Sequence, residues 1–153
     1  GAHRDLAALR SRTASITLPG GSEVAGTLTV READVPQTIA LSSLDGKLLS
    51  ESGRILLFHL TDTLNFQAKF SDANRNTLYQ WGSSQLLVRR GRAEVSFQHQ
   101  NAAEMEVFAL HADGSVAKQI PRRVENGRLF FTVDTALDGK GVLAYRIARR
   151  ESR

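Results

Sequence analysis

The sequence predicts an all-β fold, an antiparallel β-sandwich of about ten to twelve short strands. Apolar and polar residues alternate along many short segments, as they do in strands that bury one face. Sequences typical of tight turns separate these segments at intervals of roughly 8–12 residues. Helical periodicity is confined to residues 4–12, which have room for two turns. We therefore expect a short helical N-terminal segment at most.

The strands follow one another without intervening helices, which favours an antiparallel sandwich over a parallel α/β sheet. Gly, Asp and Asn mark the turns, and Asp-Gly or Asn-Gly between apolar residues predicts a hairpin because both turn positions need a positive φ. Such pairs lie at 45–46, 113–114, 126–127 and 138–139. The expected strands are 15–18, 24–30, 37–44, 47–49, 54–60, 64–70, 85–89, 93–97, 105–110, 116–120, 129–133 and 142–147.

The chain has 153 residues, a length suited to one domain that needs neither a disulfide nor a metal to be stable. We expect an N-terminal segment at 1–13 (an interdomain linker or an artificial addition), the sandwich domain at 14–149 and a tail at 150–153. Residues 54–60 are the most apolar stretch, typical of a central strand or one buried on both faces. Six phenylalanines are expected in the core: Phe66, Phe70, Phe97, Phe108, Phe130 and Phe131.

Composition excludes several classes of site. The chain has no cysteine, which excludes disulfides, thiolate metal sites and cysteine nucleophiles. No apolar run is long enough for a membrane span, and residues 1–4 do not resemble a signal peptide. The net charge is +4, with arginines clustered in the second half. Neither a recognition helix nor an aromatic RNA motif accompanies them, so we expect a solvated basic surface and no nucleic-acid partner.

No residue pattern predicts catalysis. G-x-S-x-G is absent, and the four histidines lack H-x-H and H-E-x-x-H spacing. His59, close to Thr61 and Asp62, is expected in the core or at an interface. Residues 71–74 and 134–138 carry oxygen ligands that suit calcium, but the same residues are typical of turns. We expect no catalytic residue, metal or other cofactor in this chain.

The acidic residues do not predict a pair of catalytic carboxylates. Glu94, Glu104 and Glu106 alternate with apolar residues, so solvated strand faces account for them.

Aromatic residues give the best candidates for binding. Tyr79 and Trp81 are two apart and share a face if they lie on a strand. Trp81 suits a stacking platform for sugar rings, a core plug or a docking anchor, and the sequence leaves these three open. With their neighbours they form a candidate set for carbohydrate or interdomain contact: Asn65, Phe66, Tyr79, Gln80 and Trp81.

Three stretches resemble the C-terminal β-sandwich domain of large bacterial glycoside hydrolases. Residues 41–57, LSSLDGKLLSESGRILL, are similar to that family's SLDGKPL..S.RILL block and precede a polar strand with an asparagine, here Asn65. Residues 81–95, WGSSQLLVRRGRAEV, resemble its WG..P.L...G.A.V strand pair. Residues 124–133, VENGRLFFTV, resemble its V.NG.L.FT hairpin, which a closing strand with a tyrosine follows, here Tyr145. The resemblance covers residues 24–148.

The resemblance implies a non-catalytic accessory domain that packs against and supports a catalytic (β/α)₈ barrel in the same polypeptide. The catalytic carboxylates of such enzymes belong to the barrel, so none is carried over to this chain. For a polysaccharide-degrading parent we expect a periplasmic or secreted location. Two alternatives stay open: a carbohydrate-binding module for a polysaccharide or oligosaccharide, and an envelope or adhesion domain that presents Arg89, Arg90 and Arg92 to an acidic partner.

Overall fold

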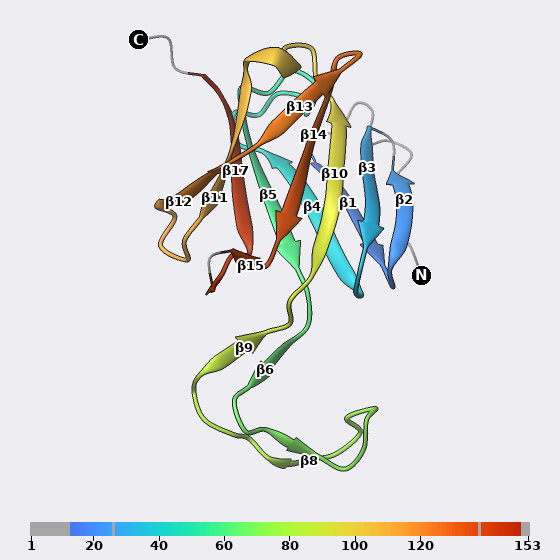
Figure 1. The fold of residues 1–153 in the computed structure, drawn as a ribbon, viewed down its shortest axis with the longest axis vertical. Helices are drawn as coiled ribbons and strands as arrows, with labels where there is room; N and C mark the ends of the chain where they lie inside the picture. Colours follow the sequence, from blue (N-terminus) through green and yellow to red (C-terminus); the bar gives the residue numbers. More distant parts are fainter. Residues whose placement is uncertain (1–12, 26, 138, 151–153) are drawn as a thin grey trace.

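Two antiparallel sheets pack face to face in this computed structural model (Figure 1). The structure describes residues 13–25, 27–137 and 139–150; the segment expected to be helical, 4–12, lies outside them. Sheet A has the order β1 (Thr13–Leu18), β4 (Gln37–Ser43), β5 (Arg54–Leu60), β17 (Ala144–Arg149), β11 (Met105–Leu110) and β12 (Val116–Ile120). Sheet B has the order β13 (Arg122–Glu125), β14 (Arg128–Asp134), β10 (Arg92–Gln98), β3 (Leu28–Ala33) and β2 (Gly21–Ala25).

The predicted all-β sandwich is therefore confirmed, with 6 strands in one sheet and 5 in the other. Three further two-stranded ladders pair β6 (Thr63–Asn65) with β9 (Leu86–Val88), β7 (Lys69–Phe70) with β8 (Leu78–Gln80), and β15 (Ala136–Leu137) with β16 (Lys140–Gly141). Ala102–Glu104 form a 3-10 turn.

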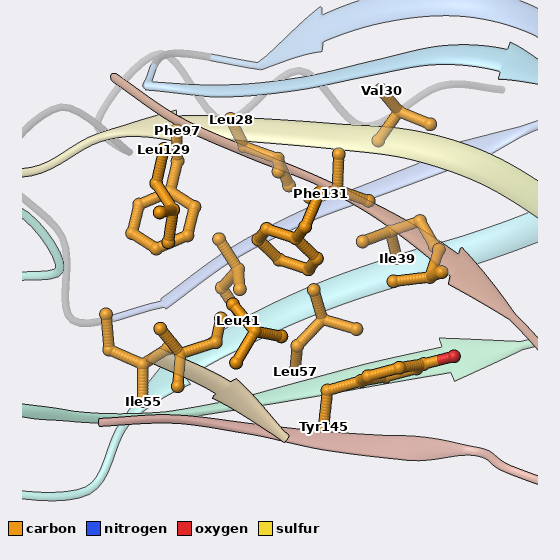
Figure 2. Packing of buried hydrophobic residues seen from close by; sticks show 14 of the residues in the cluster. Leu28, Val30, Ile39, Leu41, Ile55, Leu57, Phe97, Leu129, Phe131 and Tyr145 are labelled. Carbon is orange, nitrogen blue, oxygen red and sulfur yellow. The ribbon is translucent and has the colours of Figure 1, made fainter. Parts of the chain in front are cut away.

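Alternate residues of each strand form the core between the sheets (Figure 2). Sheet A contributes Ile39, Leu41, Ile55 and Leu57, and Phe131 is among the residues that oppose them from sheet B. Burial of each such side chain contributes about 1.5–3 kcal/mol. Because only every second position points inward, an apolar residue on the other face of the same strand stays outside the core.

Two of the six phenylalanines that were expected in the core lie there. Phe97 and Phe131 lie in the core and meet edge to face, with ring centroids 6.5 Å apart. The prediction is wrong for the other four. Phe108 and Phe130 are half-buried on the outer faces, where they lie under the guanidinium groups of Arg146 and Arg123. Phe66 is exposed and Phe70 is half-buried outside the sandwich.

Tyr145 ties the closing strand to sheet B. Its buried hydroxyl donates to the Asp134 carbonyl at 2.7 Å and accepts from the Asp134 amide at 2.8 Å. Burial raises the pKa of Tyr145 to about 12. The neutral hydroxyl both donates and accepts a hydrogen bond. It therefore links the two sheets without leaving a buried polar group unpaired.

Three of the expected strands differ from the observed ones. Residues 24–30 are not one strand, since β2 and β3 are separate strands that pair with each other. Residues 64–70 are interrupted at Gln67, whose φ of 64° breaks the extended conformation. Residues 47–49 are not a strand, because a ten-residue connection, 44–53, joins β4 to β5.

Asp45 organises this connection instead of turning a tight hairpin. Its carboxylate accepts hydrogen bonds from the hydroxyls of Ser43 and Ser52 and from the amides of Lys47 and Gly53, at 2.8–3.3 Å. Burial raises the pKa of Asp45, but these donors outweigh burial and hold the pKa well below its usual range.

The organised connection closes one end of the core. Leu49 is buried there, and the Ser52 carbonyl accepts a hydrogen bond from the His99 ring at 2.9 Å. The motif that resembles SLDGK therefore has a structural role.

We expect Asp45→Ala to lower the free energy of unfolding by about 1–2 kcal/mol, because four donors lose their acceptor in a setting that solvent partly screens. Asp113→Ala is the matched control, since the Asp113 carboxylate accepts from the amide and hydroxyl of Ser115, within its own turn. Urea unfolding measures both changes. Equal losses in the two variants would contradict the role given to Asp45.

Candidate functional site

A long arm leaves the sandwich between β5 and β10 and projects from one end of it (Figure 1). We call residues 61–90 the arm. Two short ladders, β6–β9 and β7–β8, pair its two sides. A two-stranded ribbon is marginally stable on its own in water, so the arm needs other contacts to hold its shape.

The first of these contacts is a clamp at the base of the arm. The Thr135 hydroxyl donates to the Arg89 carbonyl at 3.0 Å and accepts from the Gly91 amide at 2.9 Å, and the Thr135 amide donates to the Gly91 carbonyl at 3.0 Å. Thr61 donates to the same Arg89 carbonyl at 2.6 Å. Glycine fits closely at position 91, because a Cβ there would lie 2.7 Å from Thr61 Cγ2 and 2.8 Å from Val35 Cγ2 and would displace these side chains.

Two ion pairs reinforce the clamp. Arg90 pairs with Asp134 of β14 at 3.0 Å. Arg75, from the loop between β7 and β8, pairs with Asp62 at 2.6 Å, so this loop folds back to the start of the arm. The hydrogen bond from Arg75 lowers the pKa of Asp62 from its usual value.

A close backbone crossing fixes the middle of the arm. Gly82 has a φ of 76°, and a Cβ there would lie 2.2 Å from the Phe66 carbonyl oxygen. That oxygen accepts a hydrogen bond from the Ser83 amide at 2.8 Å. Only glycine permits this approach, so the conformation on either side of Trp81 is well determined.

All five candidate contact residues lie on the arm. The aromatic rings are open to solvent, with exposed fractions of 76% for Trp81, 74% for Tyr79 and 43% for Phe66. Gln80 is exposed and Asn65 is half-buried. Of the three roles left open for Trp81, the core plug is wrong, whereas a stacking platform and a docking anchor both fit an exposed ring.

An apolar groove begins where the arm leaves the sandwich, and sequence reasoning missed it. Its volume is about 680 Å³. The outward residues of β5 form its floor, with Phe58 39% and Leu60 44% exposed. The remaining lining residues are Leu56, Val88, Leu110, His111, Ala112, Gly114, Gly141, Leu143 and Ala144.

The signal for this groove was present in residues 54–60, which are apolar at almost every position. The pattern predicted a central strand or one buried on both faces. The structure places β5 centrally in sheet A, between β4 and β17. Its inner face enters the core, and its outer face is left without cover among the described residues.

The acidic residues do not converge on a reaction site. Glu94 pairs with Arg123, Glu104 with Arg149 and Glu106 with Arg150, at 2.9–3.3 Å. Within the described ranges no group of three or more His, Asp or Glu side chains is placed to hold a metal ion. The loop at 71–74 also has a structural role, because the Asp72 carboxylate accepts hydrogen bonds from Asn76.

His59 lies in the interior beside Gln37. The side-chain nitrogen of Gln37 donates hydrogen bonds to the Val35 and Arg92 carbonyls. Its side-chain oxygen is therefore the acceptor for His59 Nε2, at 2.6 Å. The other ring nitrogen, Nδ1, is buried with no partner in the described part of the chain. Burial lowers the pKa of His59 to about 4, although the charges of Asp134 and Asp34 act in the opposite direction.

No protein-family model, curated protein or solved structure matches this chain. None of the described helical residues forms a segment long and apolar enough to cross a membrane.

The buried imidazole of His59 predicts a pH-dependent stability. Its folded pKa of about 4 lies below the unfolded value of 6.5, so the unfolded chain takes up a proton more readily. The stabilisation present above pH 6.5 is therefore lost as the pH falls towards 4, by about 3 kcal/mol at most.

Urea unfolding between pH 7 and pH 4 measures this loss, and His59→Gln should flatten the dependence. Side-chain NMR tests the residue directly. An imidazole of His59 that titrates near pH 6.5 in the folded protein would contradict the assignment.

Proposed function

We propose that this chain is a non-catalytic accessory domain that packs against another folded domain of the same polypeptide, using the arm and the apolar groove. The observation that carries the proposal is the pair of exposed aromatic rings, Tyr79 and Trp81, on an arm whose base is firmly clamped. Trp and Tyr are the residues most enriched among the energetically dominant contacts of protein interfaces.

The rigidity of the arm supports docking. The clamp at Gly91 and the ion pair between Arg75 and Asp62 form without a partner domain and favour one position of the arm. A preorganised element loses little conformational entropy on binding, so more of the contact energy appears as affinity. Thirty residues held away from the sandwich contribute little to its core, which is consistent with a role outside it.

The groove extends the same surface. Val88 belongs to the arm and also lines the groove, next to Leu60 at the end of β5. The base of the arm therefore borders the groove, and we propose that one partner domain covers both the groove and the rings of Tyr79 and Trp81. Interfaces between domains of one chain typically bury about 600–1,500 Å².

The resemblance to the C-terminal sandwich of glycoside hydrolases supports a catalytic barrel as the partner. The catalytic carboxylates would then lie on the barrel, which agrees with the surface ion pairs of Glu94, Glu104 and Glu106. For such a polysaccharide-degrading parent the proposal includes a periplasmic or secreted location.

Hydroxyl-radical footprinting tests the proposal by comparing the isolated chain with the complete product of its gene. We expect Trp81 and Tyr79 to be oxidised several-fold less in the complete product, because the partner domain covers them. Phe130, half-buried on the outer face of sheet B, is the internal control and should react equally in both. Equal oxidation of Trp81 in both samples would overturn the proposal.

Carbohydrate binding is the second candidate, since exposed rings at Tyr79 and Trp81 also suit stacking on pyranose rings. Gln80 lies between the two rings in the sequence, and Asn65 lies on the same arm. This candidate predicts glycan-array binding by the isolated chain that Trp81→Ala abolishes while the thermal midpoint is unchanged. Val24→Ala, at a 56% exposed residue of β2, is the matched surface control. If the isolated chain binds no glycan on the array, this candidate is excluded and docking remains as the proposed function.

A further inference from the structure

The outer face of sheet B holds a half-buried arginine with no acidic partner. Arg128 begins β14 and reaches across the sheet, where its Nη1 donates to the Thr27 carbonyl at 3.0 Å and to the hydroxyls of Thr29 and Ser96 at 3.2 Å. All three acceptors are uncharged. In the described ranges no carboxylate lies within ion-pair distance of this guanidinium, unlike those of Arg75, Arg90, Arg123, Arg149 and Arg150.

Two acidic residues lie opposite Arg128 and Arg31 in the strand ladders, but a different arginine binds them both. Glu125 lies opposite Arg128 in the β13–β14 register, and Glu94 lies opposite Arg31 in the β10–β3 register. Both carboxylates instead bind Arg123. The Arg123 guanidinium also lies over the Phe130 ring, 4.2 Å from its centroid, which fixes it between the two acids.

This arrangement leaves two positive charges uncompensated at neighbouring positions. Arg31 is exposed on β3, two residues from Thr29, and among the described residues it has no ion pair. Burial, and then the positive charge of Arg31, lower the pKa of Arg128. A guanidinium that has lost part of its hydration beside a like charge is unfavourable unless an anion joins it.

The hydroxyl groups complete the set of donors. Thr29 and Ser96, buried except for 7% and 3% of their surface, face each other in the β10–β3 register. Each accepts a hydrogen bond from Arg128, so the proton of each hydroxyl remains available to donate to a ligand. Two guanidinium groups and two hydroxyls are then available on neighbouring positions of the same face of the sheet.

We propose that Arg31, Arg128, Thr29 and Ser96 form a binding site for an oxyanion, the carboxylate, sulfate or phosphate group of an acidic ligand. The arginines supply charge and paired N–H donors, and the hydroxyls supply shorter donors between them. The site lies on the sheet opposite the apolar groove of sheet A, so a ligand can bind here whether or not a partner covers the arm.

NMR titration of the isolated chain tests the site, with sodium sulfate, phosphate and acetate as probes at constant ionic strength. We expect saturable shifts of the Thr29, Ser96 and Arg128 amides with at least one probe, and the tightest probe identifies the ligand group. Arg31→Gln should weaken that binding roughly tenfold or more, because a charge-assisted contact is lost. The Arg31 side chain makes no hydrogen bond or ion pair among the described residues, so this variant should fold.

Arg54→Gln is the matched control, since it removes the same charge from an exposed position on sheet A. It should leave the affinity unchanged. Ser96→Ala tests the hydroxyl without changing the charge and should also weaken binding. Shifts that do not saturate, or that Arg54→Gln reduces as much as Arg31→Gln does, would show a general effect of positive charge and overturn the proposal. Neither result depends on whether the arm docks.

Discussion

The architecture of the arm depends on the hydrogen bonds that Thr135 makes with Gly91 and Arg89 at its base. Thr135 is buried and follows directly after β14, so these bonds attach the arm to the second sheet as well as to β5 and β10, from which it emerges. Without them, thirty residues joined by two short ladders would have no fixed direction relative to the sandwich. The exposure of Trp81 has functional meaning only because this base holds the arm in one place.

The two outer faces of the sandwich have different chemistry. The centre of sheet A, around Phe58 and Leu60, is apolar and open, whereas sheet B presents arginines and hydroxyl groups around Arg128. Packing of the core requires apolar residues at alternate positions of each strand, but it does not determine which residue types occupy the outer positions. Apolar residues on an exposed face contribute little to the stability of the isolated fold, so their presence on β5 supports the proposal that a partner domain covers them.

The sequence predicted the fold class because alternation and turn residues act locally. Asn126-Gly127 forms the expected tight hairpin, with φ values of 49° and 73°. Asp45-Gly46 does not, since the carboxylate of Asp45 has other donors within reach and forms a longer connection. The arm was not predicted, because its path depends on contacts between residues distant in sequence, such as Arg75 with Asp62 and Gly82 with Phe66. The candidate residues were chosen by chemistry alone, and their gathering on one projecting element was found only in the structure.

The most direct test of this account is an experimental structure of the complete gene product that contains these residues. The account predicts that a second folded domain contacts the Trp81 ring and covers the groove around Phe58 and Leu60, while the clamp at Gly91 keeps the geometry described above. A structure in which the arm and the groove both face solvent would contradict it. So would an arm that has left its clamp and folded onto the groove of its own sandwich.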